Sequence, residues 1–385
     1  MRVLLLPFIL AVCCPAQEQQ VLNYSIVGSS SCKTTPCFDR ALANPRAERP
    51  LLDLARNGPR ASAGIAAALS GSGVRPEDLE ALGLVRAEGD RRVLNFTLFT
   101  AEDIRRIRKV TAGYARSLAD EFVKRRSAID RALAGYNLPG ADRGAASFII
   151  LGCFSLDWDG LNITATRRYL TRQRIYWGSH NNSWAEVAFT SFGDHHSVPR
   201  TALPDAAYGR LLKMKWDFEL PSAIQRGDTD TAAAHMGRLM MTLREGPQSL
   251  NDLARKTRIE PAEAARYLSV LKTLEYVADP EGLYSAKAMV FTQRDLPMVH
   301  ELKRIGRQVM EPWLAANYSK LRGELGDTAP SRWGVPYEEG FTMIWHFVFG
   351  PTNQLLVEAG MFSDPYAPER RYQGFIPAVF PAKFN

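Results

Sequence analysis

The spacing of apolar residues divides this 385-residue chain into amphipathic stretches and more continuous apolar runs. Stretches 104–131 and 296–322 repeat apolar residues at helical intervals, which predicts two long helices. The runs from Phe148 to Phe154 and from Phe341 to Phe347 are mostly apolar, which favours buried strands. Helical and strand-like patterns in separate stretches predict the α+β class.

Several of these features occur twice, in the same order and about 190 residues apart. The segment LLDLARNGP at 51–59 resembles LMMTLREGP at 239–247, and FTxxD occurs at 99–103 and again at 291–295. In both copies a long amphipathic stretch and then a pair of phenylalanines follow. We therefore expect a tandem duplication, with the two copies paired as a pseudo-dimer inside one chain.

The second copy has the clearer order of elements. A helical stretch ends before Gly246, Ser249 is placed to cap a short helix, and Pro261 suits the first turn of a longer helix. A turn and a strand-like stretch follow. This order in residues 238–300 resembles the winged helix-turn-helix domains of the arsenic-repressor and MarR-type families, and residues 49–104 resemble a degenerate copy.

The resemblance implies that the longer helix lies in the major groove of DNA while basic residues contact phosphates. The candidates for this role are Arg255, Lys256, Arg258 and Arg266. However, residues 260–276 carry two basic against three acidic side chains, and residues 75–86 have the same balance. Because such helices repel phosphate, a DNA-binding transcriptional regulator is the alternative interpretation and not the favoured one.

The N-terminus has the features of a cleaved secretory signal. Arg2 precedes an apolar run over 3–12, and small residues lie before a cleavage position near Ala16-Gln17. The run is too short to span a bilayer, and no later stretch predicts a span. We therefore expect export to the periplasm or the extracellular space, without a membrane span in the mature chain.

Export changes what the cysteines imply. Cys32 and Cys37 enclose a short loop that a disulfide could close in an oxidising compartment, whereas Cys153, in an apolar run, predicts a buried thiol. The expected order is therefore a signal peptide (1–16), an N-terminal extension with the disulfide (17–47), a winged-helix-like module with its long helix (48–131), a strand-rich aromatic segment (132–230), a second module with its long helix (231–325) and a second strand-rich segment (326–385).

Positive charge is concentrated outside the two helices at 75–86 and 260–276, in residues 104–131, which have nine basic against three acidic side chains. With a formal net charge of +7, this suggests an anionic polymer or surface as partner, and a solvated helix face is the alternative. The candidate residues are Arg105, Arg106, Arg108, Lys109, Lys124, Arg125, Arg126, Arg167 and Arg168.

A histidine-rich stretch is the candidate for a divalent metal site. His180, Asp194, His195 and His196 supply imidazole and carboxylate ligands. Adjacent histidines in a strand point to opposite faces, and the surrounding sequence predicts an aromatic hairpin that ends in a polar turn. A metal-dependent enzyme at this stretch is therefore a second alternative.

Sequence motifs do not strengthen the catalytic alternative. The chain has no GxSxG, Walker or GxGxxG motif and no CxxC pair. Asp157 and Asp159 are spaced as in a turn with a helix cap, and His346 is expected in the core. We predict no cofactor and expect a non-catalytic binding or scaffolding protein, with a protein or an anionic partner.

The first prediction concerns export. The chain fused to a reporter that is active only after export should yield active reporter and a new N-terminus near Gln17, read by N-terminal sequencing. Leu4→Arg/Leu5→Arg/Leu6→Arg should abolish both, because it removes the apolar run. Retention of an intact Met1 in the cell would contradict export.

Overall fold

The computed structural model describes residues 22–26, 45–136, 142–160, 176–180, 229–273, 276–369, 376 and 378–380. The chain forms two compact units. Unit 1 takes its residues from Met1–Ile104, Gln173–Trp184 and Asp327–Pro336, and unit 2 takes the rest. The boundary at Ile104 therefore divides the predicted segment 48–131 between the two units.

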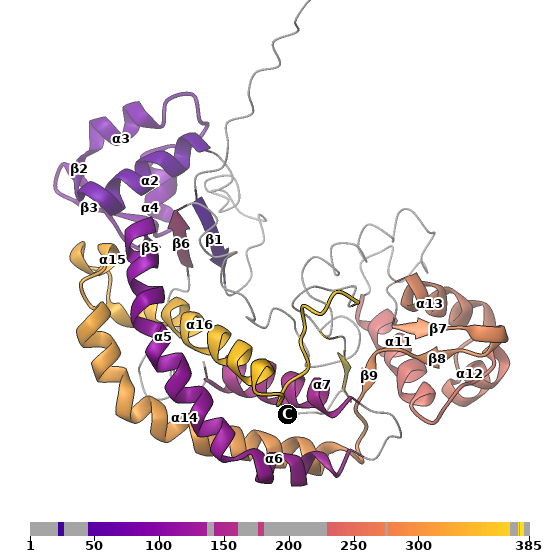
Figure 1. Ribbon diagram of the computed structural model, residues 1–385. Coiled ribbons are helices and arrows are strands. Elements are labelled where there is room, and N and C mark those ends of the chain that lie inside the picture. The colour runs from indigo at the N-terminus through magenta and orange to yellow at the C-terminus, as the bar shows by residue number, and fades with distance from the viewer. Residues whose placement is uncertain are drawn as a thin grey trace, which may run out of the picture. The chain divides into compact units, whose positions relative to one another are not determined.

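Unit 1 contains the first module, shown in Figure 1. Its elements are α2 (Pro45–Asn57), β2 (Arg60–Ala61), α3 (Ser62–Ala68), α4 (Pro76–Ala81), β3 (Val85–Glu88) and β4 (Arg91–Leu94). The strands form an antiparallel sheet in the order β2-β4-β3. Leu51 and Leu54 of α2, with Ile65, Leu79 and Leu84, form its apolar core.

The second module lies in unit 2 and repeats this order. Its elements are α11 (Thr229–Leu243), α12 (Leu250–Thr257), α13 (Pro261–Thr273), β7 (Val277–Ala278), the short helix η2 (Pro280–Gly282) and β8 (Ser285–Ala286). Gln248 pairs with Tyr284 in a bridge, at the place that β2 takes in the first module. Ser249 caps α12 by accepting the N–H of Asp252, as expected from its position before that helix.

A parallel pair of strands follows each module. In unit 1, β5 (Thr97–Phe99) pairs with β6 (Tyr176–His180), which also pairs antiparallel with β1 (Leu22–Ile26). In unit 2, β9 (Met289–Val290) pairs with β10 (Ala378–Val379). The parts of the predicted hairpin beyond His180 lie outside the described residues.

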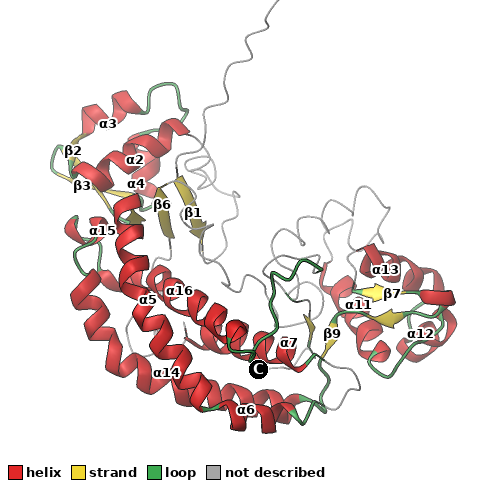
Figure 2. Ribbon diagram, in the orientation of Figure 1, coloured by secondary structure: helices red, strands yellow, loops and turns green. Residues whose placement is uncertain are grey.

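The two predicted long helices lie side by side and form the scaffold of unit 2 (Figure 2). These helices are α5 (Ala101–Lys124), which α6 (Arg126–Leu133) continues, and α14 (Leu296–Leu325). They pack antiparallel, since the indole N–H of Trp313 donates to the hydroxyl of Ser117 (3.2 Å) and the hydroxyl of Tyr114 donates to Glu324 (2.6 Å). One long helix from each predicted copy thus contributes to the same scaffold.

The prediction of strands at the two phenylalanine pairs is wrong, although the α+β class is confirmed. Residues Arg143–Ser147 form α7, Phe148–Asp159 form the π-helix η1, and Tyr337–Glu358 form α16. Consecutive residues are buried in both η1 and α16, since Ile149 and Ile150 of η1 and Ile344 and Trp345 of α16 are each 0% exposed. A helix without a solvent-facing side has no amphipathic period, so its sequence resembles that of a buried strand.

A segment from the end of the second copy packs against the first module. After α14, helix α15 (Ala329–Arg332) places Trp333 over Gly58, where a Cβ atom would lie 2.5 Å from the indole ring. Gly58 also has a φ of +83°, so both the contact with Trp333 and the backbone conformation require glycine at this position. The indole N–H of Trp333 donates to the carbonyl of Ala55 (2.8 Å).

Trp333→Ala should lower the free energy of unfolding of unit 1 by about 2–3 kcal/mol, less than for a fully buried tryptophan because Trp333 is only partly buried. The loss comes from the contact with Gly58 and from the hydrogen bond. Urea unfolding followed by circular dichroism measures it. Leu283→Ala, at a side chain that is 44% exposed, is the control and should change stability by less than about 0.5 kcal/mol.

Candidate functional site

The turn that leads into α14 is fixed by a side-chain cap that also occurs at the first turn of α5. The carboxylate of Asp295 accepts the backbone N–H of Thr292 (2.7 Å) and its hydroxyl (2.8 Å). In the first copy, Asp103 accepts the same two groups of Thr100, at 2.9 and 2.8 Å. Both aspartates are buried, and they explain the repeated FTxxD motif as a helix-capping motif.

Arg244, just after the end of α11, is held against this cap. One terminal nitrogen of its guanidinium lies 3.6 Å from the free oxygen of the Asp295 cap, and its Nε donates to the carbonyl of Val290 (3.1 Å). The same guanidinium lies over the ring of Tyr136, 5.2 Å from its centre. With 15% of its side chain exposed, Arg244 has three contacts that fix its position at the foot of the second module.

Tyr136 is the deepest of these residues and comes from the segment after α6. Its side chain is 2% exposed, and its hydroxyl donates to the carbonyl of Val290 (3.3 Å). Burial raises the pKa of Tyr136 to about 12, so the phenol stays neutral at physiological pH. Tyr136 therefore supports Arg244 as an aromatic platform and not as a charged group.

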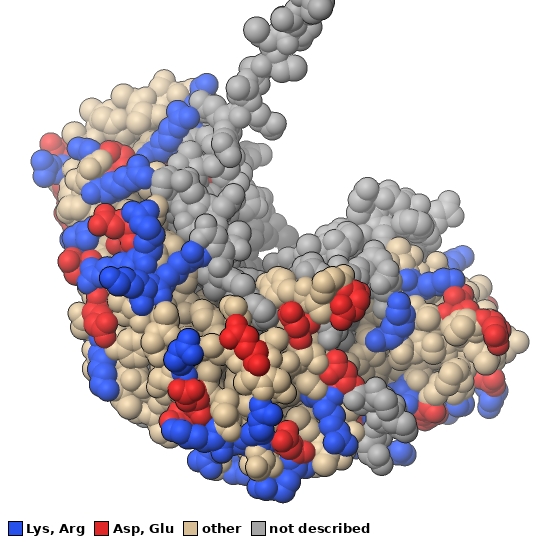
Figure 3. All heavy atoms as spheres, in the orientation of Figure 1, with Lys and Arg blue, Asp and Glu red and all other residues tan. Residues whose placement is uncertain are grey.

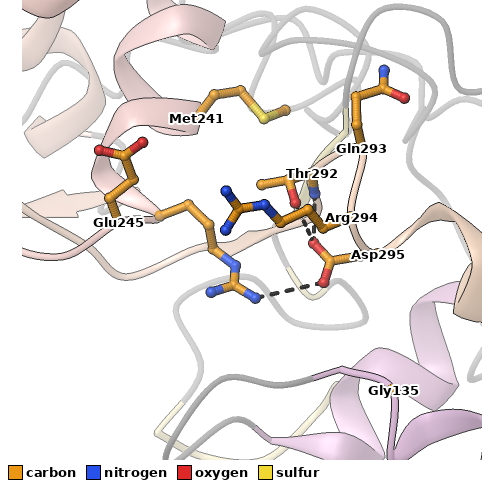
Figure 4. A pocket seen from close by; sticks show the side chains of 8 residues that line it. Gly135, Met241, Glu245, Thr292, Gln293, Arg294 and Asp295 are labelled. Carbon is orange, nitrogen blue, oxygen red and sulfur yellow. Dashed lines mark hydrogen bonds and ion pairs between the residues drawn. The ribbon is translucent and has the colours of Figure 1, made fainter.

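A pocket of about 540 Å³ opens beside this arrangement (Figure 4). Its volume is in the range of pockets that hold small molecules. Figure 4 shows the side chain of Arg294 reaching into the space between Met241 and Asp295. The pocket is lined by Gly135, Met241, Arg244, Glu245, Thr292, Gln293, Arg294 and Asp295.

A second cavity of about 380 Å³ shares Arg244 and is lined also by Tyr136, Asp142, Pro247 and Lys287. Arg244 thus borders open space on more than one side. Sequence reasoning missed Arg244, Arg294 and Tyr136 as site residues. The available signal was that Arg244 and Asp295 lie in the two repeated segments, which meet at the foot of the module.

The predicted metal site cannot be assembled from the described residues. His180 lies at the end of β6, whereas Asp194, His195 and His196 lie outside the described part of the chain. Within the described ranges, no group of three or more potential ligands gathers around one point. Cys32 and Cys37 also lie outside these ranges, and Cys153 is buried in η1 as expected.

The predicted basic surface on α5 and α6 is only partly available. Arg106 and Arg126 donate to the carbonyls of Glu324 and Ala359, and Lys124 pairs with Glu121 at 2.6 Å. The exposed residues Arg105, Lys109 and Arg125 and the half-buried Arg108 complete the described set, while Arg167 and Arg168 lie outside it. On the face that Figure 3 shows, basic side chains lie among acidic ones.

The predicted DNA contacts are on α12 and α13. Arg255 pairs with Asp252 at 2.9 Å and Lys256 with Glu245 at 3.2 Å, whereas Arg258 and Arg266 are exposed. The carboxylate of Glu263 accepts the hydroxyl of Tyr267 (3.0 Å), and its side chain is 32% exposed. DNA binding stays an alternative prediction.

Asp157 and Asp159 do not form the predicted turn and cap. Both are within the buried end of η1, where Asp157 lies 3.9 Å from the imidazole of His346 and Asp159 lies 3.5 Å from the ammonium group of Lys303. His346 is buried as expected, but it belongs to α16 and not to a strand. These contacts tie η1 to α16 and α14. No helix among the described residues has an apolar stretch long enough to cross a bilayer.

Arg244→Met should lower the free energy of unfolding by about 3 kcal/mol, because it leaves the buried carboxylate of Asp295 without its cation. Arg56, the counterpart in the first copy, is exposed, so Arg56→Met is a matched control with an expected change below about 0.5 kcal/mol. Urea unfolding of the two variants measures the difference. Equal effects would contradict the role assigned to Arg244.

Comparisons with known proteins do not identify the chain. No family model matches it, and neither does any curated protein or solved structure. The winged-helix resemblance therefore stays a prediction, and the function is inferred from the residues around the pocket.

Proposed function

We propose that this is an exported, non-catalytic binding protein that receives a small ligand in the pocket at the foot of the second module. The observation that carries the proposal is that Arg244 is held by three contacts at the edge of a pocket of about 540 Å³. A side chain that is fixed before binding loses little conformational freedom when the ligand arrives. This favours recognition at Arg244.

The two modules are winged-helix-type units that serve as rigid frames in this proposal. Their common order of helices and antiparallel strands supports the assignment. Each module also contacts an aromatic residue of the segment that follows the other copy's long helix, Trp333 for the first module and Tyr136 for the second. Such contacts suit modules that are used for packing and binding, and export suits a ligand outside the cytoplasm.

The roles of the lining residues favour binding over catalysis. The hydroxyl of Thr292 donates to Asp295, and the carboxylate of Asp295 is occupied by the helix cap and by Arg244. Glu245 pairs with Lys256. The acidic and hydroxyl groups at the pocket thus have structural partners in the described chain, which leaves arginine and amide groups to contact a ligand.

A pocket-filling variant tests the proposal. A thermal-shift screen of anionic, neutral and cationic small molecules should find compounds that raise Tm. A ligand at 100 times its Kd stabilises the folded state by about 2.7 kcal/mol. Met241→Trp should remove the effect, because the indole would occupy the pocket that Met241 lines.

Ala262→Trp, on the exposed side of α13, is the control and should leave the shift intact. Mass spectrometry should recover the bound compound unchanged, as expected for a protein without catalysis. A screen without any stabilising compound, or equal shifts in wild type and Met241→Trp, would contradict the proposal.

A further inference from the structure

We infer that the pocket at the foot of the second module selects a small organic anion with a carboxylate or phosphate group. The inference rests on the proposed function, because it assumes that the pocket receives a ligand. Two arginines border the pocket, Arg244 from the module and Arg294 from the segment before α14. Their guanidinium groups offer paired N–H donors, which match the oxygens of carboxylates and phosphates.

Two arginines and two carboxylates line the pocket, but Glu245 is shared with a lysine outside the lining. Asp295 faces Arg244, and Glu245 pairs with Lys256 of α12. Arg294 is exposed and has no acidic partner within the described residues. With Lys256 included, this group of side chains carries three positive and two negative charges, and a bound anion would balance the excess.

The N-terminal end of α14 also favours a negative charge near the pocket. The pocket residues Thr292, Gln293 and Arg294 lie just before the N-terminus of this 30-residue helix. The N-terminal end of a helix carries partial positive charge and favours anions nearby. Met241 lines the same pocket with an apolar side chain, and Gln293 lines it with an amide. These side chains match a ligand that has an anionic group at one end. The rest of the ligand would be apolar or would form a hydrogen bond with the amide of Gln293.

The first copy provides an internal comparison. There the free oxygen of the capping carboxylate of Asp103 accepts the backbone N–H of Ala329 (3.1 Å), where Asp295 faces Arg244. Trp333 lies over Gly58, the counterpart of Gly246. Aligning the FTxxD motifs places Glu102 at the position of Arg294, so the charge is reversed between the copies. The anion-binding features are thus additions of the second copy and not requirements of the shared cap.

Calorimetric titration of the full mature chain tests the inference, with benzoate, phenyl phosphate and the neutral benzamide as probes at low ionic strength. Benzoate or phenyl phosphate should bind at least about 10-fold more tightly than benzamide. The probe that binds more tightly then shows whether the pocket prefers a carboxylate or a phosphate group. Arg294→Glu should lower the affinity for the anion by at least about 10-fold, because it replaces the attracting charge with a repelling one.

Glu102→Arg is the matched control, since it makes the opposite exchange at the equivalent place in the first copy, and it should leave the affinity unchanged. Arg294→Glu should fold normally, because an acidic residue near the N-terminus of a helix is favourable and the first copy has Glu102 in the first turn of α5. Circular dichroism and Tm check this. Arg294→Gln, which removes the charge without reversing it, should give an intermediate affinity.

Three outcomes would overturn the inference. The first is equal binding of benzamide and benzoate, and the second is unchanged affinity for the anion in Arg294→Glu. Either would show a ligand-binding pocket that does not select anions, so the proposed function would stand without this inference. The third is no binding of either anion, in which case the screen with Met241→Trp decides separately whether the pocket binds any ligand.

Discussion

The buried carboxylate of Asp295 is the group on which the rest of the site depends. A charge out of water is stable only when hydrogen bonds and an opposite charge compensate it. The N–H and hydroxyl of Thr292 and the guanidinium of Arg244 supply this compensation, and Arg244 in turn lies on Tyr136. One capping residue thereby joins the start of α14 to the second module and to the segment after α6.

The two copies use the same cap for different purposes. In the first copy the free oxygen of Asp103 receives a backbone N–H from α15, and Trp333 covers the end of α2. In the second copy Arg244 takes that role and a pocket lies beside it. The two modules thus have equivalent junctions, of which one is closed by packing and the other is lined by charged side chains.

Much of the architecture could be predicted from local patterns. The α+β class, the two long helices and the cap at Ser249 depend on residues close in the sequence, and the prediction of each is confirmed. The strands predicted at Phe148 and Phe341 failed because a buried helix has no polar face. The site was missed because Tyr136, Arg244 and Asp295 lie far apart in the sequence, and only the fold brings them together.

Native mass spectrometry of the protein purified gently from its native source tests the central claim most directly, because it detects the ligand that the protein itself selects. We expect one small anionic molecule per chain, released on unfolding and missing from Arg294→Glu prepared in the same way. A protein without bound small molecules, or a ligand that remains equally bound to Arg294→Glu, would contradict the assignment of the pocket.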